Sequence, residues 1–347
     1  MPPLDDFRAW LEGQSEERSF FSGTFWFLFS MLDDGEFHRA IELDAVAVSP
    51  IPCVARSTTS TVYMRTGSSV RATFSEIPIR RDNVRILFSL DKPAVALRPM
   101  YRLLARTRGR VHLFPLGAPL VKACARLVSG ASIEETHVLR GVSYPSRPND
   151  GGADINLKPG NASVFFTKLR EERRILKTAR LKAPVGKDSF CEFTVGRAGY
   201  ITYHKGKLGP LLELISGDLT RRFSESVRPF EKTAGRFVDF RFEEPLFVDR
   251  ANYAVVVNAL SQMPRTSVAL LHTNPYFHAA LTNYEDGSEF DIFITGHSTI
   301  SIQGREDASP ASFLRIQNGL TEQFRDASIS LEAPTRFSLR DLLNGQV

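Results

Sequence analysis

The most restrictive feature of this sequence is an apolar run, FFSGTFWFLFSML, between Phe20 and Leu32. It is too short to cross a bilayer as a helix, which takes about 20 residues. Within it, Phe25, Phe27 and Phe29 alternate with other large apolar residues, so an extended chain would carry apolar side chains on both sides. The run therefore predicts a strand with both faces buried, and we expect no membrane contact.

Length and pattern set the organisation. A chain of 347 residues exceeds the roughly 250–300 residues at which one core usually stops growing. Turn-forming residues crowd the stretch SYPSRPNDGGADINLKPGN. We therefore predict two domains, residues 1–145 and 161–347, joined by a linker at 146–160. The predicted fold is α/β or α+β, and each domain opens with antiparallel hairpins followed by alternating helices and strands.

Several segments carry specific predictions. Residues 19–48 are expected to form a hairpin that turns at Asp33–Gly35, and residues 60–74 and 190–204 two further hairpins. The basic stretch 166–182 is compatible with a helix or a hairpin, of which we favour the hairpin. A long helix bent near Gly217 and, further on, a strand, a helix over 275–284 and a second strand complete the pattern.

Cysteine usage indicates the compartment. Cys53, Cys124 and Cys191 lie far apart, so their spacing predicts neither a disulfide framework nor a zinc ribbon. Isolated thiols suit a reducing environment, and we predict a cytoplasmic protein. The sequence contains no HxH or HExxH spacing and none of the common nucleotide-binding or hydrolase glycine motifs. We accordingly expect no cofactor and no bound metal.

Charge is distributed unevenly. Residues 1–50 carry 3 basic and 10 acidic side chains, whereas residues 80–126 carry 11 basic and 2 acidic ones. In RPMYRLLARTRGR, arginines recur at every fourth position and then continue beyond the expected helix. We call this set the arginine stripe; it comprises Arg98, Arg102, Arg106, Arg108 and Arg110.

Two roles for the arginine stripe follow from this distribution. Guanidinium groups bind phosphates bidentately, which favours a nucleic acid, DNA or RNA, as partner. The acidic N-terminal fifty residues and the acidic C-terminal tail are alternative anions, so the stripe is equally compatible with docking inside the chain or with a protein partner or homo-oligomer.

A second candidate site lies near the C-terminus. If the strands that end at His272 and His297 are parallel and joined by a helix over 275–284, both histidines lie at one sheet edge. That edge is where open α/β sheets usually bind ligands. Thr273 and Asn274 would begin the helix and present free amides to an anion. Asp291 is expected to be remote, so the more economical interpretation is a polar edge without catalysis.

These observations predict a non-catalytic nucleic-acid-binding or polyanion-binding protein, or an accessory subunit of a larger complex. The first alternative is a protein–protein assembly subunit, which charge segregation and the abundance of Phe favour. The second alternative is an enzyme that acts on a phosphorylated ligand or a phosphodiester. Such an enzyme would use His272 and His297 as its catalytic residues, at the edge defined above.

Overall fold

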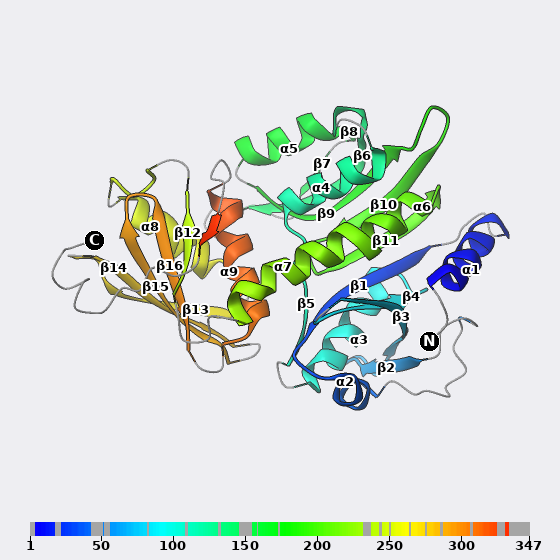
Figure 1. Ribbon diagram of the computed structural model, residues 1–347, viewed down its shortest axis with the longest axis horizontal. Helices are drawn as coiled ribbons and strands as arrows, with labels where there is room; N and C mark the ends of the chain where they lie inside the picture. Colours follow the sequence, from blue (N-terminus) through cyan, green and yellow to red (C-terminus); the bar gives the residue numbers. More distant parts are fainter. Residues whose placement is uncertain are drawn as a thin grey trace. The chain divides into compact units, whose positions relative to one another are not determined.

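The computed structural model describes residues 4–17, 22–42, 51, 56–81, 83–107, 110–130, 133–145, 155–157, 159–172, 174–231, 237–242, 245–249, 251–263, 265–274, 276–284, 287–305, 308–324 and 330–332 (Figure 1). The chain divides into two compact units. The first comprises Met1–Tyr144 and Ala153–Ser224, and the second Pro145–Gly152 and Glu225–Val347. Each unit contains its own antiparallel sheet with helices packed against it, which confirms the predicted mixed α/β class.

The first unit is built on one large sheet. Its strands run in the order β2-β3-β4-β1-β11-β10-β9-β6-β7, with β5 paired to β1 and β8 to β6. Their bounds are β1 (Gly23–Ser30), β2 (Ser57–Tyr63), β3 (Ser69–Arg81), β4 (Val84–Ser89), β5 (Val111–Leu113), β6 (His137–Pro145), β7 (Ile155–Leu157), β8 (Gly160–Asn161), β9 (Arg174–Pro184), β10 (Phe190–Gly196) and β11 (Tyr200–Gly206).

Helices lie on both faces of this sheet. Their bounds are α1 (Leu4–Glu17), α2 (Asp34–Ala40), α3 (Pro93–Ala105), α4 (Ala118–Ser129), the short η1 (Ile133–Glu135), α5 (Ala162–Glu171), α6 (Gly209–Glu213), the π-helical η3 (Leu214–Leu219) and α7 (Thr220–Glu231). The last three are continuous along the chain and form the predicted long helix. Gly217 lies in the π-helical turn, the kind of irregularity that bends helices.

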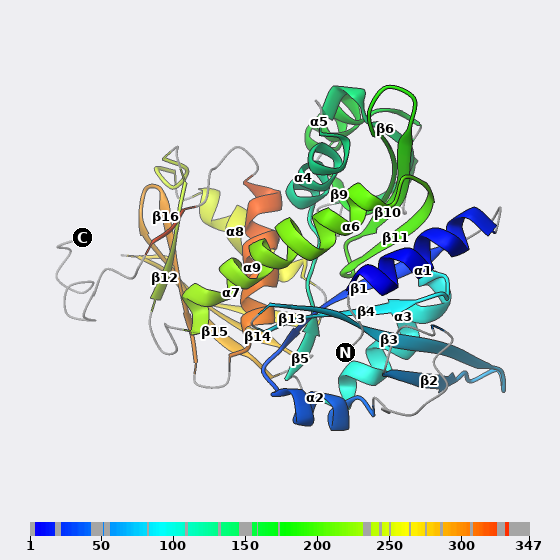
Figure 2. The same ribbon diagram turned by 45° about the vertical axis from the view of Figure 1, so that its right-hand side comes forward.

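Strand β1 confirms the prediction made from the apolar run. Every residue of β1 is buried, and the strand pairs with β4 on one side and β11 on the other. Trp26 belongs to a core that includes α2 and α3 residues. On the other face, Phe25 packs edge-to-face with Phe7 of α1, and Phe27 contacts Phe223 of α7. The ribbons of α1 and α7 are labelled in Figure 2. The alternating aromatic residues of β1 thus pack against helices on both faces of the sheet.

Two predictions in the first unit are wrong. The first hairpin is replaced after β1 by α2, because the Asp33 side chain accepts a hydrogen bond from the Glu36 amide and caps a helix. The stretch 166–182 is neither of the two predicted forms. Helix α5 occupies its start and β9 its end, and Leu176, Ala179 and Leu181 are buried in β9.

The second unit has a smaller sheet, in the order β13-β14-β15-β16-β12-β17. The elements are β12 (Phe237–Arg241), α8 (Ala251–Ser261), β13 (Thr266–His272), β14 (Phe277–Asn283), β15 (Glu289–Gly296), β16 (Thr299–Gly304), α9 (Pro310–Gln323) and β17 (Ser330–Glu332). Helix α9 begins as predicted: the Ser309 side chain accepts a hydrogen bond from the Ser312 amide, and Pro310 takes the first helical position.

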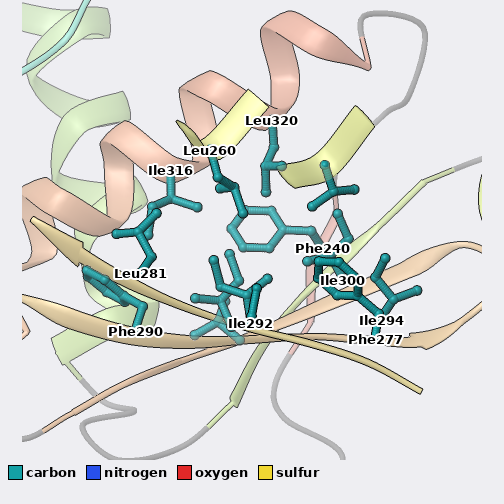
Figure 3. Close-up of a cluster of buried hydrophobic side chains, with 14 of the residues drawn as sticks. Phe240, Leu260, Phe277, Leu281, Phe290, Ile292, Ile294, Ile300, Ile316 and Leu320 are labelled. Atoms are coloured by element: carbon teal, nitrogen blue, oxygen red, sulfur yellow. The ribbon is translucent and has the colours of Figure 1, made fainter. Parts of the chain in front are cut away.

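The core of the second unit lies between its sheet and the two helices (Figure 3). Phe240 and Ile292 point up from the strands, and Leu260 and Ile316 point down from α8 and α9. One face of the sheet is therefore covered by helices, which leaves the polar positions of the same strands on the opposite face.

The helix predicted over 275–284 is wrong. Residues Phe277–Asn283 form strand β14, in which burial alternates strictly and Phe277, Ala279 and Leu281 face the core. Each segment joining β13, β14 and β15 connects an antiparallel pair, so the parallel crossover does not exist.

The predicted independence of residues 1–145 and 161–347 stays a prediction, but the sheet of the first unit includes strands from both sides of the linker. Strand β1 pairs with β11 and β6 with β8, so residues 160–206 complete the sheet that the N-terminal residues begin. Among the described residues, no helix combines the length and apolar character needed to cross a membrane.

Candidate nucleic-acid interface

The arginine stripe runs along α3 and past its end. Arg98 donates to the sulfur of Met64, and Arg102 to the Thr61 carbonyl of edge strand β2. Arg106 pairs with Glu42, and Arg110 with Glu36 at 2.9 Å. Arg108 lies outside the described residues. The helix begins earlier than predicted, at Pro93, because Pro99 is accommodated within it.

Each described arginine of the stripe thus has an acceptor within the chain. Two of these acceptors belong to the acidic N-terminal segment, which is the docking alternative anticipated from the charge distribution. Both members of each pair are substantially exposed: the side chains are 35% and 65% exposed for Arg106 and Glu42. Exposed pairs of this kind contribute little to stability, so the guanidinium groups remain accessible to competing anions.

A second group of cations lies elsewhere in the first unit. Arg180 of β9 and Lys205 of β11 pair with Glu192 of β10, and Lys182 of β9 lies opposite Glu192 in the strand register. We call these three basic residues the cationic cluster. The Arg180 Nε donates to Glu192 Oε1 at 2.6 Å, and the Lys205 Nζ lies 3.5 Å from Oε2. The Glu192 side chain is only 3% exposed, whereas that of Lys205 is 62% exposed.

An aromatic side chain, Phe190, lies beside the cationic cluster. The ammonium of Lys182 lies 4.3 Å from the centre of the Phe190 ring, and that of Lys205 lies 5.8 Å from it. Cations within about 6 Å of a ring face are attracted to its negative quadrupole. Phe190 is partly exposed, so the cluster presents ring surface and positive charge together.

Strand periodicity places the cationic cluster on one side of β9–β11. Ala179, Leu181, Phe193 and Ile201 are fully buried on the other side, where α4 and the α6–α7 helix lie across the strands (Figure 1). The side that carries the cationic cluster is called the open face below. Its side chains include the exposed Lys182 and Lys205.

His204 is the titratable imidazole of the open face. Its pKa is lowered to about 4, chiefly by burial and in addition by the nearby cations Arg180 and Lys205, while Glu192 opposes the shift. Its Nε2 lies 2.8 Å from the Thr194 hydroxyl. The ring is therefore neutral at neutral pH and adds no charge of its own, while its position among cations makes its protonation sensitive to a bound anion.

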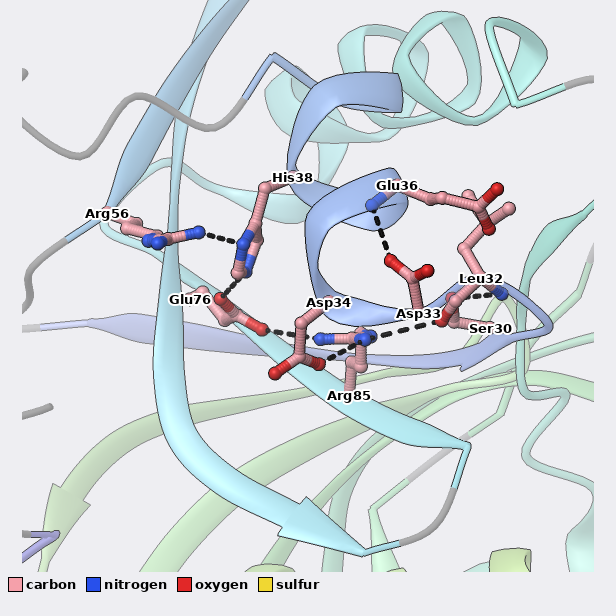
Figure 4. A network of polar contacts seen from close by, with 9 residues as sticks. All are labelled: Ser30, Leu32, Asp33, Asp34, Glu36, His38, Arg56, Glu76 and Arg85. Atoms are coloured by element: carbon pink, nitrogen blue, oxygen red, sulfur yellow. Dashed lines mark hydrogen bonds and ion pairs between the residues drawn. The ribbon is translucent and has the colours of Figure 1, made fainter.

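A buried polar network fastens α2 to the sheet (Figure 4). The Glu76 carboxylate accepts hydrogen bonds from His38 Nε2 at 2.7 Å and from Arg85 Nη1 at 3.2 Å. Arg85 also forms an ion pair with Asp34 at 2.7 Å. Arg56 has only donors, so its contact with His38 Nδ1 requires that nitrogen to accept and places the ring proton on Nε2. Both ring nitrogens are engaged, which suits a structural role and not that of a free general base.

The thiols described in the structure are also unsuited to nucleophilic chemistry. Burial raises the pKa of Cys124 to about 12 and that of Cys191 to about 12. Neither sulfur is therefore a thiolate at neutral pH. Cys53 lies outside the described residues.

The predicted edge formed by His272 and His297 rests on a crossover that is absent. His272 ends β13, whereas His297 lies in the turn between β15 and β16, so β14 separates the strands that lead to them. Thr273 and Asn274 follow β13 in a loop and do not begin a helix. Without that helix, the amide site proposed for an anion loses its basis.

Asp291, expected to be remote from His272 and His297, lies beside a different histidine, His278. It receives His278 Nε2 at 3.0 Å, because both residues face away from the core on neighbouring strands. Within the described part of the chain, no three His, Cys, Asp or Glu side chains come together as metal ligands. The contact between His278 and Asp291 therefore lies on the outer face of the sheet without a third metal-ligating side chain among the described residues.

Sequence reasoning missed the cationic cluster because it assigned 166–182 to a hairpin. The usable signal was the period of two in KTARLK, which sets Thr178, Arg180 and Lys182 on one side of a strand. Lys205 comes from the distant stretch HKGK, and nothing in the local pattern joins the two.

No protein-family model matches this chain, and no curated protein matches it.

Proposed function

We propose that this protein binds nucleic acid without acting on it catalytically, alone or as an accessory subunit, and that the open face of its first unit makes the principal contact. The observation that carries the proposal is the gathering of Arg180, Lys182 and Lys205 on one side of three adjacent strands. Among the described residues, the carboxylate that pairs with these cations is that of Glu192, so three positive charges surround one negative charge.

The chemistry of the open face suits a phosphate backbone. Ammonium and guanidinium groups that replace condensed counterions gain affinity from the release of those ions. Lys182 and Lys205 present their ammonium groups to solvent, while Glu192 fixes the Arg180 fork. Phe190 offers a ring beside the charges, as surfaces that bind single strands commonly do.

The arginine stripe enters this proposal as a secondary contact. Its described members are exposed but already paired with acceptors in the chain, among them Glu36 and Glu42. A polyanion has to displace those carboxylates, which reduces the net gain from each arginine. We therefore assign the stripe a supporting role in affinity.

Charge reversal tests the principal contact. In the Lys182→Glu/Lys205→Glu variant we expect affinity for a nucleic acid to fall at least about tenfold at physiological salt, and the log–log salt slope to fall by about 2, one for each lost phosphate contact. Both side chains are solvent-facing, so the variant should remain folded. Fluorescence anisotropy with labelled single- and double-stranded oligonucleotides, repeated over a salt series, measures both quantities.

A matched control separates local contact from net charge. Arg126→Glu/Lys168→Glu makes the same change in net charge at exposed positions on α4 and α5. We expect it to change affinity less than about twofold at physiological salt, where screening limits distant charges. Equal losses in the two variants would contradict the open face as the binding surface, and the absence of any binding by the wild type would contradict the proposed function itself.

A protein-assembly role is the second candidate, and edge strand β13 favours it. Residues Thr266–His272 contain no charged side chain, and Leu270 and Leu271 are each 48% exposed. Natural edge strands usually carry charges or prolines that prevent pairing with another strand. The mass of the protein in solution tests this candidate: a stable oligomer supports it, and a monomer at micromolar concentration opposes it.

A further inference from the structure

The second unit carries a set of stacked rings on the sheet face opposite its core. His278 of β14 stacks on Phe293 of β15, with ring centres 4.2 Å apart and planes 16° apart. His272 of β13 continues the series, with its ring 6.1 Å from that of His278 and inclined by 21°. These three rings, called the ring stack below, come from three successive strands of the sheet.

A β-bulge brings His272 into the ring stack. Leu270 pairs with Ala279, which faces the core, and the register then shifts so that His272 pairs with His278. Paired residues of neighbouring strands lie on the same face. Without the bulge, the period of two would place His272 on the same side as Leu270; the extra residue turns it outward, as bulges do where a side chain must be redirected.

Polar contacts fix the middle of the ring stack. Asp291 accepts a hydrogen bond from His278 Nε2 at 3.0 Å and a second one from Arg305 Nε at 3.3 Å. Arg305 is held in turn by Glu289 at 2.6 Å. The His278 ring therefore cannot rotate without breaking this chain of contacts, so the orientation of the ring stack is set before any ligand arrives.

The outer end of the ring stack is accessible. His272 is exposed, and β13 is an edge strand of its sheet, so among the described residues no further strand lies beyond it. Tyr276 flanks the ring stack: its ring centre lies 5.9 Å from that of His272, at a tilt of 50°, and 6.4 Å from that of Phe293, at a tilt of 40°. A flat ring entering here would extend the stack on His272 with Tyr276 at its side.

We propose that the open end of the ring stack, formed by His272 and Tyr276, binds an unpaired nucleobase. This inference rests on the proposed function for the identity of its ligand and makes that ligand single-stranded, since a base inside a duplex has both faces covered by its neighbours. Stacking on side-chain rings tolerates every base, so the site contributes affinity for single strands without reading sequence.

Two probes test the inference in the full-length protein. The first is a short single strand that carries a fluorescent adenine analogue, whose emission is quenched by stacking. The second is free adenosine, detected by saturation-transfer NMR. We expect the wild type to quench the first probe and to transfer saturation to the second.

The His272→Ala/Tyr276→Ala variant should lose both signals and bind the single strand at least about fivefold more weakly, the lower range for a lost base–ring contact. Its affinity for a duplex should be unchanged. Leu270→Ala is the matched control, because this residue is exposed on the same strand but pairs toward the other face. Wild-type quenching and affinity in the double variant would overturn the inference.

The same experiment separates this inference from the proposed function. If Lys182→Glu/Lys205→Glu loses oligonucleotide binding while His272→Ala/Tyr276→Ala retains both signals, only the base site fails. If no oligonucleotide binds but adenosine transfer is present and is lost in His272→Ala/Tyr276→Ala, only the proposed function fails. Absence of both signals in the wild type overturns the base site directly.

Discussion

The arginine stripe and the cationic cluster contain the same kind of charge but are constructed differently. The stripe is contiguous in sequence, and its described arginines pair with exposed partners such as Glu36 and Glu42. The cationic cluster draws on two strands that are distant in sequence and surrounds a buried carboxylate, Glu192. The arginine stripe is a charged helix surface, whereas the cationic cluster is arranged around the buried carboxylate of Glu192.

This difference shows why density of charge in a sequence is a poor guide to a binding surface. Arginines spaced along a helix reach whatever acceptors lie nearby, and on α3 the chain itself supplies those acceptors. A buried carboxylate has the opposite effect, because it must be compensated and so holds its cations in place. Fixed cations lose less conformational entropy when a ligand binds.

The largest expected effect concerns stability. Arg180→Gln leaves Glu192, 3% exposed, with only the longer contact to Lys205, so we expect the free energy of unfolding to fall by about 2–3 kcal/mol. Arg106→Gln leaves an exposed Glu42 and should cost less than about 0.5 kcal/mol. Urea unfolding followed by circular dichroism measures both.

A compensating change sharpens this test. Arg180→Gln/Glu192→Gln removes the unpaired carboxylate and should recover most of the loss, since two neutral amides tolerate burial better than one isolated charge. Equal costs for Arg180→Gln and Arg106→Gln would show that the two regions are energetically alike.

The next effect depends on pH. The pKa of His204 is about 4 in the folded protein, below the ordinary 6.5 of an unfolded chain, so between these values the unfolded state binds more protons. The free energy of unfolding should therefore fall as pH falls from about 6.5 toward 4, by about 1–2 kcal/mol after allowance for partial exposure. Above pH 6.5 this contribution is fully present.

His204→Gln provides the comparison for this pH dependence. Glutamine keeps a polar partner for Thr194 but does not titrate, so the variant should show a flatter profile between pH 6.5 and 4 when unfolding is followed in urea. Identical slopes for the variant and the wild type would show that His204 is not a titrating group of the open face.

The smallest expected effect concerns binding by the arginine stripe. Arg98→Glu/Arg102→Glu/Arg106→Glu changes more charge than Lys182→Glu/Lys205→Glu, yet we expect it to weaken nucleic-acid binding by less than about threefold at physiological salt. Anisotropy under the conditions used for the open face makes the two values comparable. A larger loss in the triple variant would reverse the ranking and make the stripe the principal surface.

Much of the local structure was predictable from pattern. The alternation of aromatic residues identified β1, the turn at 196–199 identified the β10–β11 hairpin, and Ser309-Pro310 identified the start of α9. In each case the local signal and the tertiary environment favour the same conformation, which is when sequence reasoning succeeds.

The wrong predictions fall where local signals are ambiguous. PYFHAALTNY contains alanine and leucine, which favour a helix, but also an apolar residue at every second position. The seven residues of β14 are too few to distinguish the period of two of a strand from the period of 3.6 of a helix. The choice was made by β13 and β15, which offer hydrogen-bonding partners on both sides of β14.

The sequence by itself determined which segments are apolar on both sides, where several helices begin and how unevenly charge is distributed. Only the tertiary structure decided which charges meet. Lys205 joins Arg180 across β10, and His272 joins His278 through a bulge, because strand pairing and register bring together residues that no local period connects. Periodicity acts over a few residues, whereas pairing depends on the packing of the whole sheet.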